Sequence, residues 1–356
     1  MNGKQLSYKA LLWLKVKKFF PQPSVNEWLL ENFSAVEDFI NCPKEQLIEK
    51  GWPEQLLSPW QALKCFKVNT KEIQNQDFKI VCIEDELYPP LLREIKNPPA
   101  LLFYIGDFSY LSGKTVSIVG SRRCSLQGID FTKEIARHLA LNGYTVVSGL
   151  AAGIDTAAHQ GAIEVGKTAA ILGCGLNICF PFSNRALFSA VKAKGCLVSE
   201  YFWGERPLKH HFPYRNRIIS GLSETLIVIE AGEKSGALIT AGFALNQGRE
   251  VLAAPGNPGE IYAKGCNGLI KDGAFLITEI ADLDQFFDIK KRAVNKSRKG
   301  FSSDPIINLL SDEPKSLDQL AGLIKEEAGA LLARLTKLEI EQVIAKNEQN
   351  KFFIKT

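Results

Sequence analysis

The sequence predicts an α/β protein with a mostly parallel sheet, and three observations support that fold class. From residue 115 onward, short β-rich runs alternate with helical patterns, as in strands that are joined by crossover helices. Several runs are unbroken apolar segments, such as 225–229, which is typical of strands covered on both faces. The 356 residues, 46% apolar and 23% charged, are enough for two or three domains.

Residues 1–70 are predicted to form a helical domain. Apolar helical patterns separated by prolines predict helices at 11–20, 25–33, 36–40 and 44–50. The first twenty residues carry lysines inside the apolar pattern and lack a small-residue cleavage site, so we expect no signal peptide. No apolar run reaches the roughly 18 residues that a membrane span needs, so we expect no membrane partner.

Residues 71–285 are predicted to form the central α/β domain, which opens with a strand at 77–83. The strands that follow residue 115 are expected at 116–119, 145–148, 168–172, 197–199, 225–229, 250–253 and 274–277. The helices between them include 129–141, 157–165, 184–193 and 237–247.

The C-terminal part divides into a linker and a small domain. Residues 286–304 lose the periodicity and are rich in Lys and Arg, which predicts a flexible basic linker. Residues 305–356 show helical patterns at 306–310, 317–324 and 328–340, followed by strand-like segments at 342–345 and 351–354. Three helices and a β-hairpin are the layout of a winged-helix domain.

The positive charge of the chain is concentrated in its middle. Residues 114–280 hold 17 Lys and Arg against 13 Asp and Glu, whereas residues 1–113 hold 13 against 14 and residues 305–356 hold 7 against 8. An anionic partner is therefore expected to bind the central domain. The eight cysteines form no C-x-x-C pair and no zinc-ligand spacing, which indicates reduced thiols in a cytoplasmic protein without a metal site.

One segment of the central domain, 211–223, combines two arginines with aromatic residues. Arg215 and Arg217 are suited to bidentate phosphate contacts, and Phe212 and Tyr214, together with Phe182 upstream, could stack on bases. The segment therefore indicates a polyanion-binding surface. The alternative is a pair of structural arginines that are tied to buried carboxylates.

The Gly-Ser-Arg turn after the strand at 116–119 is a second candidate phosphate site. Gly120 and Ser121 precede a helix whose exposed N–H groups favour an anion, and Arg122 adds a bidentate donor. The alternative is a tight turn with solvated arginines. In the next strand-end loop, we expect Asp155 to cap the following helix and to bond His159 one turn later.

The motifs of several enzyme classes are absent from the sequence. There is no G-x-S-x-G elbow, no P-loop and no H-E-x-x-H. The first turn is not G-x-G-x-x-G, and no acidic residue ends the second strand to hold a ribose, so a nicotinamide cofactor is disfavoured. We expect a Rossmann-type scaffold without a cofactor.

At these motifs the chain resembles the DNA-processing protein DprA (Smf) family. The resemblance covers roughly residues 81–278, where many motifs agree in order and spacing. They include Tyr88-Pro89-Pro90-Leu91-Leu92, Val119-Gly120-Ser121-Arg122, Ser148-Gly149-Leu150-Ala151-Ala152-Gly153-Ile154-Asp155, Phe212-Pro213 with Arg215-Asn216-Arg217-Ile218-Ile219, and Ser235-Gly236-Ala237-Leu238-Ile239-Thr240-Ala241.

The resemblance implies a non-catalytic cytoplasmic protein. Members of the family bind and protect single-stranded DNA and load the recombinase RecA onto it during natural transformation. They are described as homodimers with an extended Rossmann-like core and an N-terminal helical domain that is similar to a sterile alpha motif (SAM-like). Many members carry a winged-helix domain at the C-terminus.

The family's functional residues map onto two regions of this chain. The strand-binding arginine maps to Arg122, and the predicted DNA-binding set is Gly120, Ser121, Arg122, Arg185, Lys209, Phe212, Arg215, Asn216 and Arg217. The dimer face, which overlaps the recombinase contact, maps to Leu269, Ile270 and Leu276. Many members have a Gly-x-Gly hairpin near the N-terminus, where this chain has Lys17-Lys18-Phe19-Phe20-Pro21, so DNA contact by the helical domain is in doubt.

Two other functions remain as alternatives. A nucleotide phosphoribohydrolase of the lysine-decarboxylase-like (LOG) family would have a similar scaffold and a P-G-G-x-G-T-x-x-E loop. The nearest match here, Pro255-Gly256-Asn257-Pro258-Gly259-Glu260, lacks that spacing. The other alternative is a recombinase adaptor that does not bind DNA without its partner.

Overall fold

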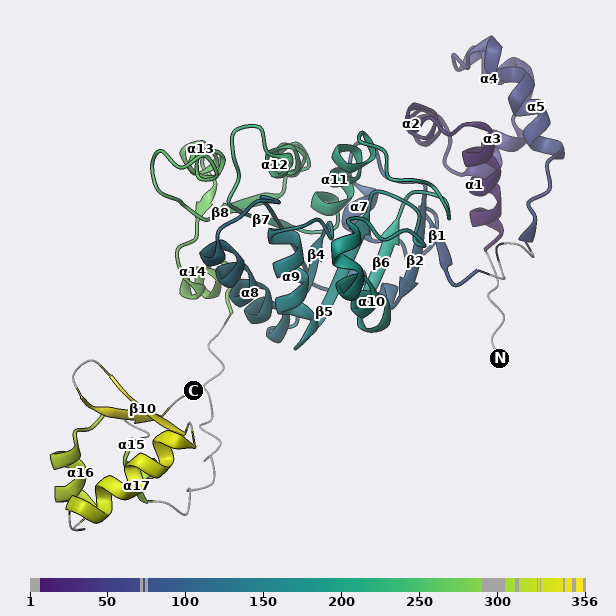
Figure 1. The fold of residues 1–356 in the computed structure, drawn as a ribbon. Coiled ribbons are helices and arrows are strands. Elements are labelled where there is room, and N and C mark those ends of the chain that lie inside the picture. Colours follow the sequence, from purple (N-terminus) through teal and green to yellow (C-terminus); the bar gives the residue numbers. More distant parts are fainter. Residues whose placement is uncertain are drawn as a thin grey trace. The chain divides into compact units, whose positions relative to one another are not determined.

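The computed structural model describes residues 7–70, 73, 76–289, 305–310, 314–324, 326, 328–341, 343–347 and 350–354. The chain divides into two compact units, Met1–Ile289 and Lys290–Thr356. The larger unit holds the sheet and the helices that cover it, and the smaller unit has a hydrophobic core of its own (Figure 1).

A mostly parallel sheet forms the centre of the larger unit. Within the described residues its strand order is β1-β2-β6-β5-β4-β3-β7-β8-β9. The strands β3 to β9 pair parallel with one another, whereas β2 pairs antiparallel with both β1 and β6. The strands are β1 (Lys79–Cys82), β2 (Leu101–Gly106), β3 (Thr115–Gly120), β4 (Thr145–Ser148), β5 (Lys167–Leu172), β6 (Cys196–Ser199), β7 (Thr225–Ile229), β8 (Glu250–Ala253) and β9 (Phe275–Leu276).

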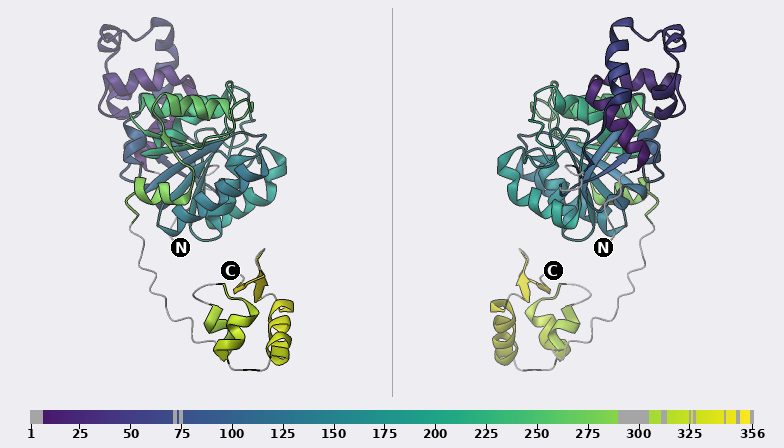
Figure 2. Two further views of the ribbon diagram at one scale, coloured as in Figure 1. Left: turned by 90° about the vertical axis from the view of Figure 1, so that its left-hand side faces the viewer. Right: turned by 90° about the vertical axis from the view of Figure 1, so that its right-hand side faces the viewer.

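Helices cover both faces of this sheet (Figures 1 and 2). Alternate residues of a strand point to opposite faces, so Leu226 and Val228 of β7 join one apolar cluster while Ile227 and Ile229 join the other. The first cluster packs under α11 and α12, and the second packs under α8, α9 and α14. The helices of this region are α7 (Pro90–Arg93), α8 (Leu126–Leu141), α9 (Ile154–Ile163), α10 (Arg185–Lys194), α11 (His211–Gly221), α12 (Gly236–Asn246), α13 (Lys264–Lys271) and α14 (Ile280–Phe286).

The predicted α/β fold class is confirmed. Each strand predicted between residues 115 and 280 is present, with ends that differ by one residue at most, and α8 and α9 start three residues before the predicted helices. Helix α11 is an element to which the sequence analysis assigned no structure. It contains both arginines of the segment 211–223, and their side chains are buried.

The N-terminal helices pack against one edge of the sheet. They are α1 (Tyr8–Phe19), α2 (Pro23–Asn32), α3 (Val36–Asn41), α4 (Lys44–Glu49) and α5 (Leu57–Cys65), of which α5 was not predicted from the sequence. The indole N–H of Trp13 donates to Glu84 at 2.9 Å, and Trp13 belongs to the same apolar cluster as Val81 of β1. Residues 7–70 therefore share a core with the sheet, and the SAM-like assignment stays a prediction.

The end of the central domain lies later than predicted. Residue 286 was expected to begin the linker, but Phe286 ends α14, and the Phe287 ring packs 5.0 Å from that of Tyr144. Phe286, Phe287 and Ile289 pack against the apolar cluster that contains Ile135 and Leu139 of α8, so the chain stays attached to the central domain up to residue 289. Residues 290–304, which make up most of the predicted basic linker, lie outside the described residues.

The smaller unit has the predicted order of elements. It contains α15 (Pro305–Leu310), α16 (Leu317–Ile324), α17 (Ala328–Ile340), and the antiparallel strands β10 (Ile344–Lys346) and β11 (Phe352–Ile354). Leu320, Leu331, Leu335 and Phe352 are among the residues of its core. The winged-helix assignment stays a prediction. No helix in the described parts of the chain is long and apolar enough to span a bilayer.

His159 is buried between α9 and the sheet, and it does not bond Asp155 as predicted. Its Nδ1 lies 2.7 Å from the hydroxyl of Thr168, which itself donates to the Val146 carbonyl. Nδ1 must therefore donate, and Nε2 is left without a partner among the described residues. Burial and, second, the charge of Arg215 lower the pKa of His159 to about 3, so the ring is neutral.

We predict that His159 makes the fold sensitive to acid. Between pH 6.5 and about 3 the unfolded chain binds a proton that the folded chain excludes, so stability is full above pH 6.5 and falls as the pH drops. Urea unfolding of His159→Asn should show a slope of stability against pH that is shallower than wild type by about 1.4 kcal/mol per pH unit. His210→Asn, at an exposed position, should follow wild type. Parallel curves for His159→Asn and wild type would contradict the prediction.

Candidate functional site

The candidate site is a cleft at the carboxyl ends of β3 and β7. β3 lies between β4 and β7, so the chain leaves β3 toward one side of the sheet and returns on the other. In open α/β sheets, ligands bind at such a switch point. A cleft of about 940 Å³ lies here, between the turn after β3, the N-terminal part of α11 and the loop before α12.

The cleft carries more basic than acidic side chains. Its two acids are Asp155, which is buried, and Glu233, which pairs with Lys264 at 3.5 Å. The basic side chains of its lining are Arg122, Arg123, Lys209, Arg215, Lys234 and Lys264. All of these except Arg215 are exposed, so the cleft presents a positive surface to solvent.

The turn that carries Arg122 is fixed by close backbone contacts. A Cβ on Gly120 would collide with the Ile229 carbonyl of β7, so only glycine lets the two strand ends approach this closely. Gly153, at a φ of +80°, packs against the carbonyls of Ser121 and Arg122 in the same way. The Ser121 N–H donates to the Glu230 carbonyl at 2.7 Å.

The side chain of Arg122 is available to a ligand. It is exposed, and among the described residues no carboxylate lies within ion-pair distance of it. Its guanidinium carbon lies 5.7 Å from the centroid of the Phe212 ring, which in turn contacts the Phe180 ring at 5.2 Å. A cation beside two aromatic rings at the mouth of a cleft can hold a phosphate next to a stacked base.

Arg215 lies in the floor of this cleft and is not the exposed phosphate ligand that was predicted. Its side chain is 4% exposed, and its Nη1 donates to the Gly149 carbonyl at 2.9 Å. A Cβ on Gly149 would come within 2.7 Å of both the Arg215 guanidinium and the Asp155 carboxylate. Burial lowers the pKa of Arg215, and Asp155 opposes that shift.

Asp155 is not the helix cap that was predicted. Gly153 holds the N-cap position of α9, and the Asp155 carboxylate accepts hydrogen bonds from the N–H groups of Gly149 and Ala151 at 3.1 and 3.3 Å. Burial raises the pKa of Asp155, which the charge of Arg215 counteracts. The carboxylate therefore shapes the loop after β4 and places a negative charge near Arg215.

The interpretation of Arg217 as a phosphate ligand is wrong. Its side chain is 3% exposed, and its Nη2 lies 2.9 Å from both carboxylate oxygens of Glu200. The Tyr214 ring covers the guanidinium, with 3.9 Å from its carbon to the ring centroid, so Tyr214 is not a free platform for bases either. For Arg217 the structural alternative holds.

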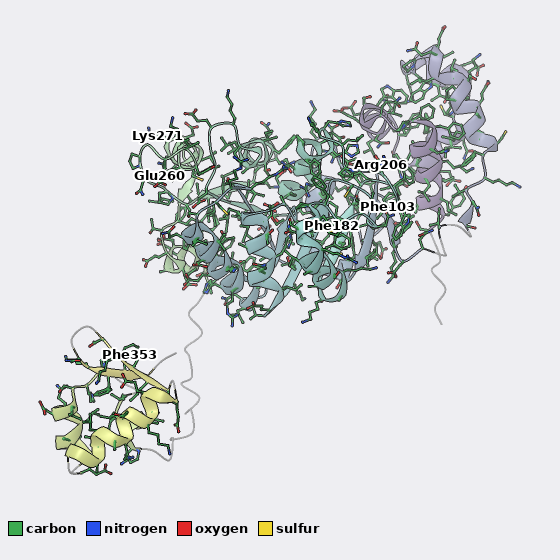
Figure 3. The ribbon with its side chains drawn as sticks, in the orientation of Figure 1. Phe103, Phe182, Arg206, Glu260, Lys271 and Phe353 are labelled. Carbon is green, nitrogen blue, oxygen red and sulfur yellow. The ribbon has the colours of Figure 1, made fainter. Side chains whose placement is uncertain are left out.

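The remaining predicted DNA-binding residues fall into two places. Lys209, Phe212 and Asn216 line the cleft, and the Asn216 amide donates to the Gly236 carbonyl at 3.3 Å. Arg185 is exposed at the start of α10 and is not part of the lining. It lies 5.7 Å from the ring of Phe182, which is 71% exposed (Figure 3).

The predicted dimer face lies at the β9 edge of the sheet. Leu269 and Ile270 are half-buried on α13, and Leu276 of β9 is 45% exposed. The turn between α13 and β9 is closed by a hydrogen bond of 2.8 Å from the Ala274 N–H to the Leu269 carbonyl.

Sequence reasoning missed part of the basic surface. Arg123, Lys234 and Lys264 also line the cleft. Arg123 is next to Arg122 in the predicted turn. Lys234 lies in the loop after β7, where two glycines and a serine are the sequence signal of a strand end. Lys264 follows another strand, and nothing in its local sequence indicates that it faces the same cleft.

The comparisons with known proteins agree with the predicted family. The family model for DNA recombination-mediator protein A matches residues 79–288. The chain belongs to this family. The sequence resemblance to DprA proteins is thereby confirmed, and the matched residues include every residue of the predicted site.

Named relatives share this region with the chain. DNA processing protein DprA of Streptococcus pneumoniae is 44% identical over 209 residues, which are 58% of this chain and 74% of the relative. Protein Smf of Escherichia coli is 42% identical over 209 residues, which are 58% of this chain and 56% of the relative. The chain thus spans little more than half of the longer relatives.

Two solved structures resemble the fold. The X-ray structure of DprA from Streptococcus pneumoniae matches with a TM-score of 0.69 at 34% identity and covers 78% of this chain and 98% of its own. DprA from Helicobacter pylori, whose structure was described for its single-stranded DNA binding mode, matches with a TM-score of 0.56 at 28% identity. That match covers 60% of this chain and 97% of its own.

We predict that Glu200 is essential for stability because its carboxylate neutralises the buried guanidinium of Arg217. In Glu200→Ala the buried guanidinium loses its carboxylate, which should cost about 3–5 kcal/mol of unfolding free energy in urea titrations. Glu224→Ala, at an exposed position, should change stability by less than about 0.5 kcal/mol. A loss of similar size in both variants would contradict the assignment of Arg217 to a buried ion pair.

Proposed function

We propose that this protein binds single-stranded DNA in the cleft at the ends of β3 and β7, without chemical change to the strand. The observation that carries the proposal is the exposed and unpaired Arg122 in a rigid turn beside Phe212. A guanidinium binds phosphate through a bidentate contact, while an adjacent ring stacks on a base of any sequence. The structure of the Helicobacter pylori relative, described for its binding of single-stranded DNA, supports this ligand.

Several contacts would hold the strand. Arg122 binds a phosphate at the mouth, with Gly120 and Ser121 placing the turn. Lys209 and Lys234 attract neighbouring phosphates, and Phe212 stacks on a base. Arg215 contributes a positive potential from the floor of the cleft rather than a direct contact, because its side chain is buried.

The proposed biological role follows from the family. The protein protects incoming single strands in the cytoplasm and loads RecA onto them during natural transformation. It acts as a homodimer whose face includes Leu269, Ile270 and Leu276. The exposed apolar side chains of β9, Phe275 and Leu276, support this part of the proposal, since edge strands with such side chains favour association.

The phosphoribohydrolase alternative finds less support in the cleft. Glu260, the glutamate of the nearest matching loop, is exposed beside α13 (Figure 3) and accepts a hydrogen bond from Asn257 at 3.1 Å. It lines a separate cavity of about 320 Å³ and not the basic cleft. Release of free base from nucleoside monophosphates would overturn the non-catalytic proposal.

We predict that binding depends on salt and on Arg122. In fluorescence anisotropy with a labelled oligo(dT), affinity should fall steeply as salt rises and should exceed the affinity for duplex. Arg122→Ala should weaken binding about tenfold or more at one salt concentration, because a charge-assisted contact is lost. The slope of log K against log salt should become less steep by about 0.7, which is the contribution of one phosphate contact.

The matched control is Arg137→Ala. It removes the same charge from α8, outside the cleft, where Arg137 pairs with Glu164 at 3.0 Å. This variant should bind nearly as wild type does. Affinity that is independent of salt, or equal affinities for Arg122→Ala and wild type, would refute the proposed site. Binding by the isolated protein also separates this function from that of an adaptor that needs its partner.

A further inference from the structure

Glu230, the residue that follows β7, has an unusual backbone conformation. Its φ is +51°, in the left-handed region that residues with a Cβ rarely adopt. Such strain persists only where the surrounding structure requires it, and it is frequent beside ligand sites. Glu230 is directly beside the turn of Arg122, because its carbonyl accepts the Ser121 N–H at 2.7 Å.

The side chain of Glu230 holds the other end of the same turn. Its Oε2 accepts the Ser125 N–H at 2.8 Å, and its Oε1 accepts the Ser125 hydroxyl. The Ser125 hydroxyl oxygen accepts in turn from the Gly128 N–H at 2.9 Å and so caps α8. A single residue thus binds both ends of the segment 121–125, which carries Arg122 between them.

The space for this carboxylate is built into α8. A Cβ on Gly128 would lie 2.5 Å from the Glu230 Oε1, so any larger residue would displace the carboxylate. The carboxylate also occupies the helix N-terminus, which in related folds receives the phosphate of a nucleotide. With that position filled by a side chain of the protein itself, the exposed donors of this turn for an external phosphate are the side chains of Arg122 and its neighbour Arg123.

We propose that Glu230 is the positioning residue of the DNA site: it holds the turn so that Arg122 points into the cleft. This inference rests on the proposed function. Glu230 does not touch the strand. Its role is to fix the backbone from both ends through the Ser121 N–H and the Ser125 N–H and hydroxyl.

Electrostatics and positioning predict opposite results for the removal of this carboxylate. Loss of a negative charge beside a phosphate-binding cleft should by itself strengthen binding. Loss of the residue that orients Arg122 should weaken binding. Glu233 is the matched control, since it is an exposed acid of the cleft whose ion-pair partner is Lys264, outside the turn of Arg122.

The test measures oligo(dT) affinity and its salt slope by anisotropy for the full-length chain. The variants are wild type, Arg122→Ala, Glu230→Ala, Glu230→Gln, Glu233→Ala and the double variant Arg122→Ala/Glu230→Ala. Glu230→Ala should weaken binding about as much as Arg122→Ala and reduce the salt slope equally. The double variant should bind the oligonucleotide no more weakly than Arg122→Ala does, because both changes remove the same contact between Arg122 and the strand. Glu233→Ala should bind more tightly than wild type.

Glu230→Gln and one additional variant, Ser125→Ala, protect the test against misfolding. Glu230→Gln keeps the backbone contact and one acceptor oxygen, so it should recover part of the affinity. Ser125→Ala removes the hydroxyl contact and leaves Glu230 in place, and it should show a smaller loss with a reduced salt slope. Far-UV circular dichroism and thermal unfolding confirm that each variant is folded, and if Glu230→Ala does not fold, Ser125→Ala and Glu230→Gln decide.

The outcomes separate this inference from the proposed function. If Arg122→Ala weakens binding while Glu230→Ala binds as wild type or more tightly, Glu230 does not position the turn, and the DNA site stands. Additive losses in the double variant would likewise overturn the inference, since Glu230 would then act independently of Arg122. If wild type does not bind the oligonucleotide, the proposed function itself fails.

Discussion

The close approach of the ends of β3 and β7 is the constraint on which the site depends. Gly120 lies against the Ile229 carbonyl with no room for a Cβ, and the backbone of the next residue bonds Glu230. The chain leaves β3 toward β4 on one side of the sheet and later returns to β7 on the other side. The connections therefore diverge at the ends of β3 and β7, and a cleft lies between them. The turn of Arg122, the first residues of α9 and the loop before α12 are all placed by this contact.

A pair of buried arginines on α11 builds the floor beneath that cleft. Arg217 is neutralised by Glu200 and covered by Tyr214, so it fixes α11 to the end of β6. Arg215 bonds a backbone carbonyl and has Asp155 as its nearest compensating charge. A buried charge without a close partner is costly for a fold, but at the base of the cleft proposed to bind DNA it adds to the positive potential of the site.

The sequence was sufficient to predict the sheet because buried parallel strands are apolar runs bounded by glycine and serine turns, as in β7. It was also sufficient to place Arg122 in an exposed turn at the end of β3, since that turn is local in sequence. It could not predict the roles of Arg215 and Arg217, because their partners, Gly149 and Glu200, are distant in the chain and follow other strands. For the same reason Lys264 could not be assigned to the cleft, and α11 was missed because charged residues interrupt its apolar pattern.

Hydrogen exchange with and without a saturating oligo(dT) tests the location of the site most directly. It reports on the backbone amides of each segment and does not depend on substitutions. We expect exchange to slow in the turn at 120–123, in the N-terminal part of α11 and in the loop at 232–237, which together line the cleft. Exchange in β1, β2 and residues 305–354 should be unchanged. Protection confined to those outer segments, with no change in the turn of Arg122, would contradict a DNA site at the ends of β3 and β7.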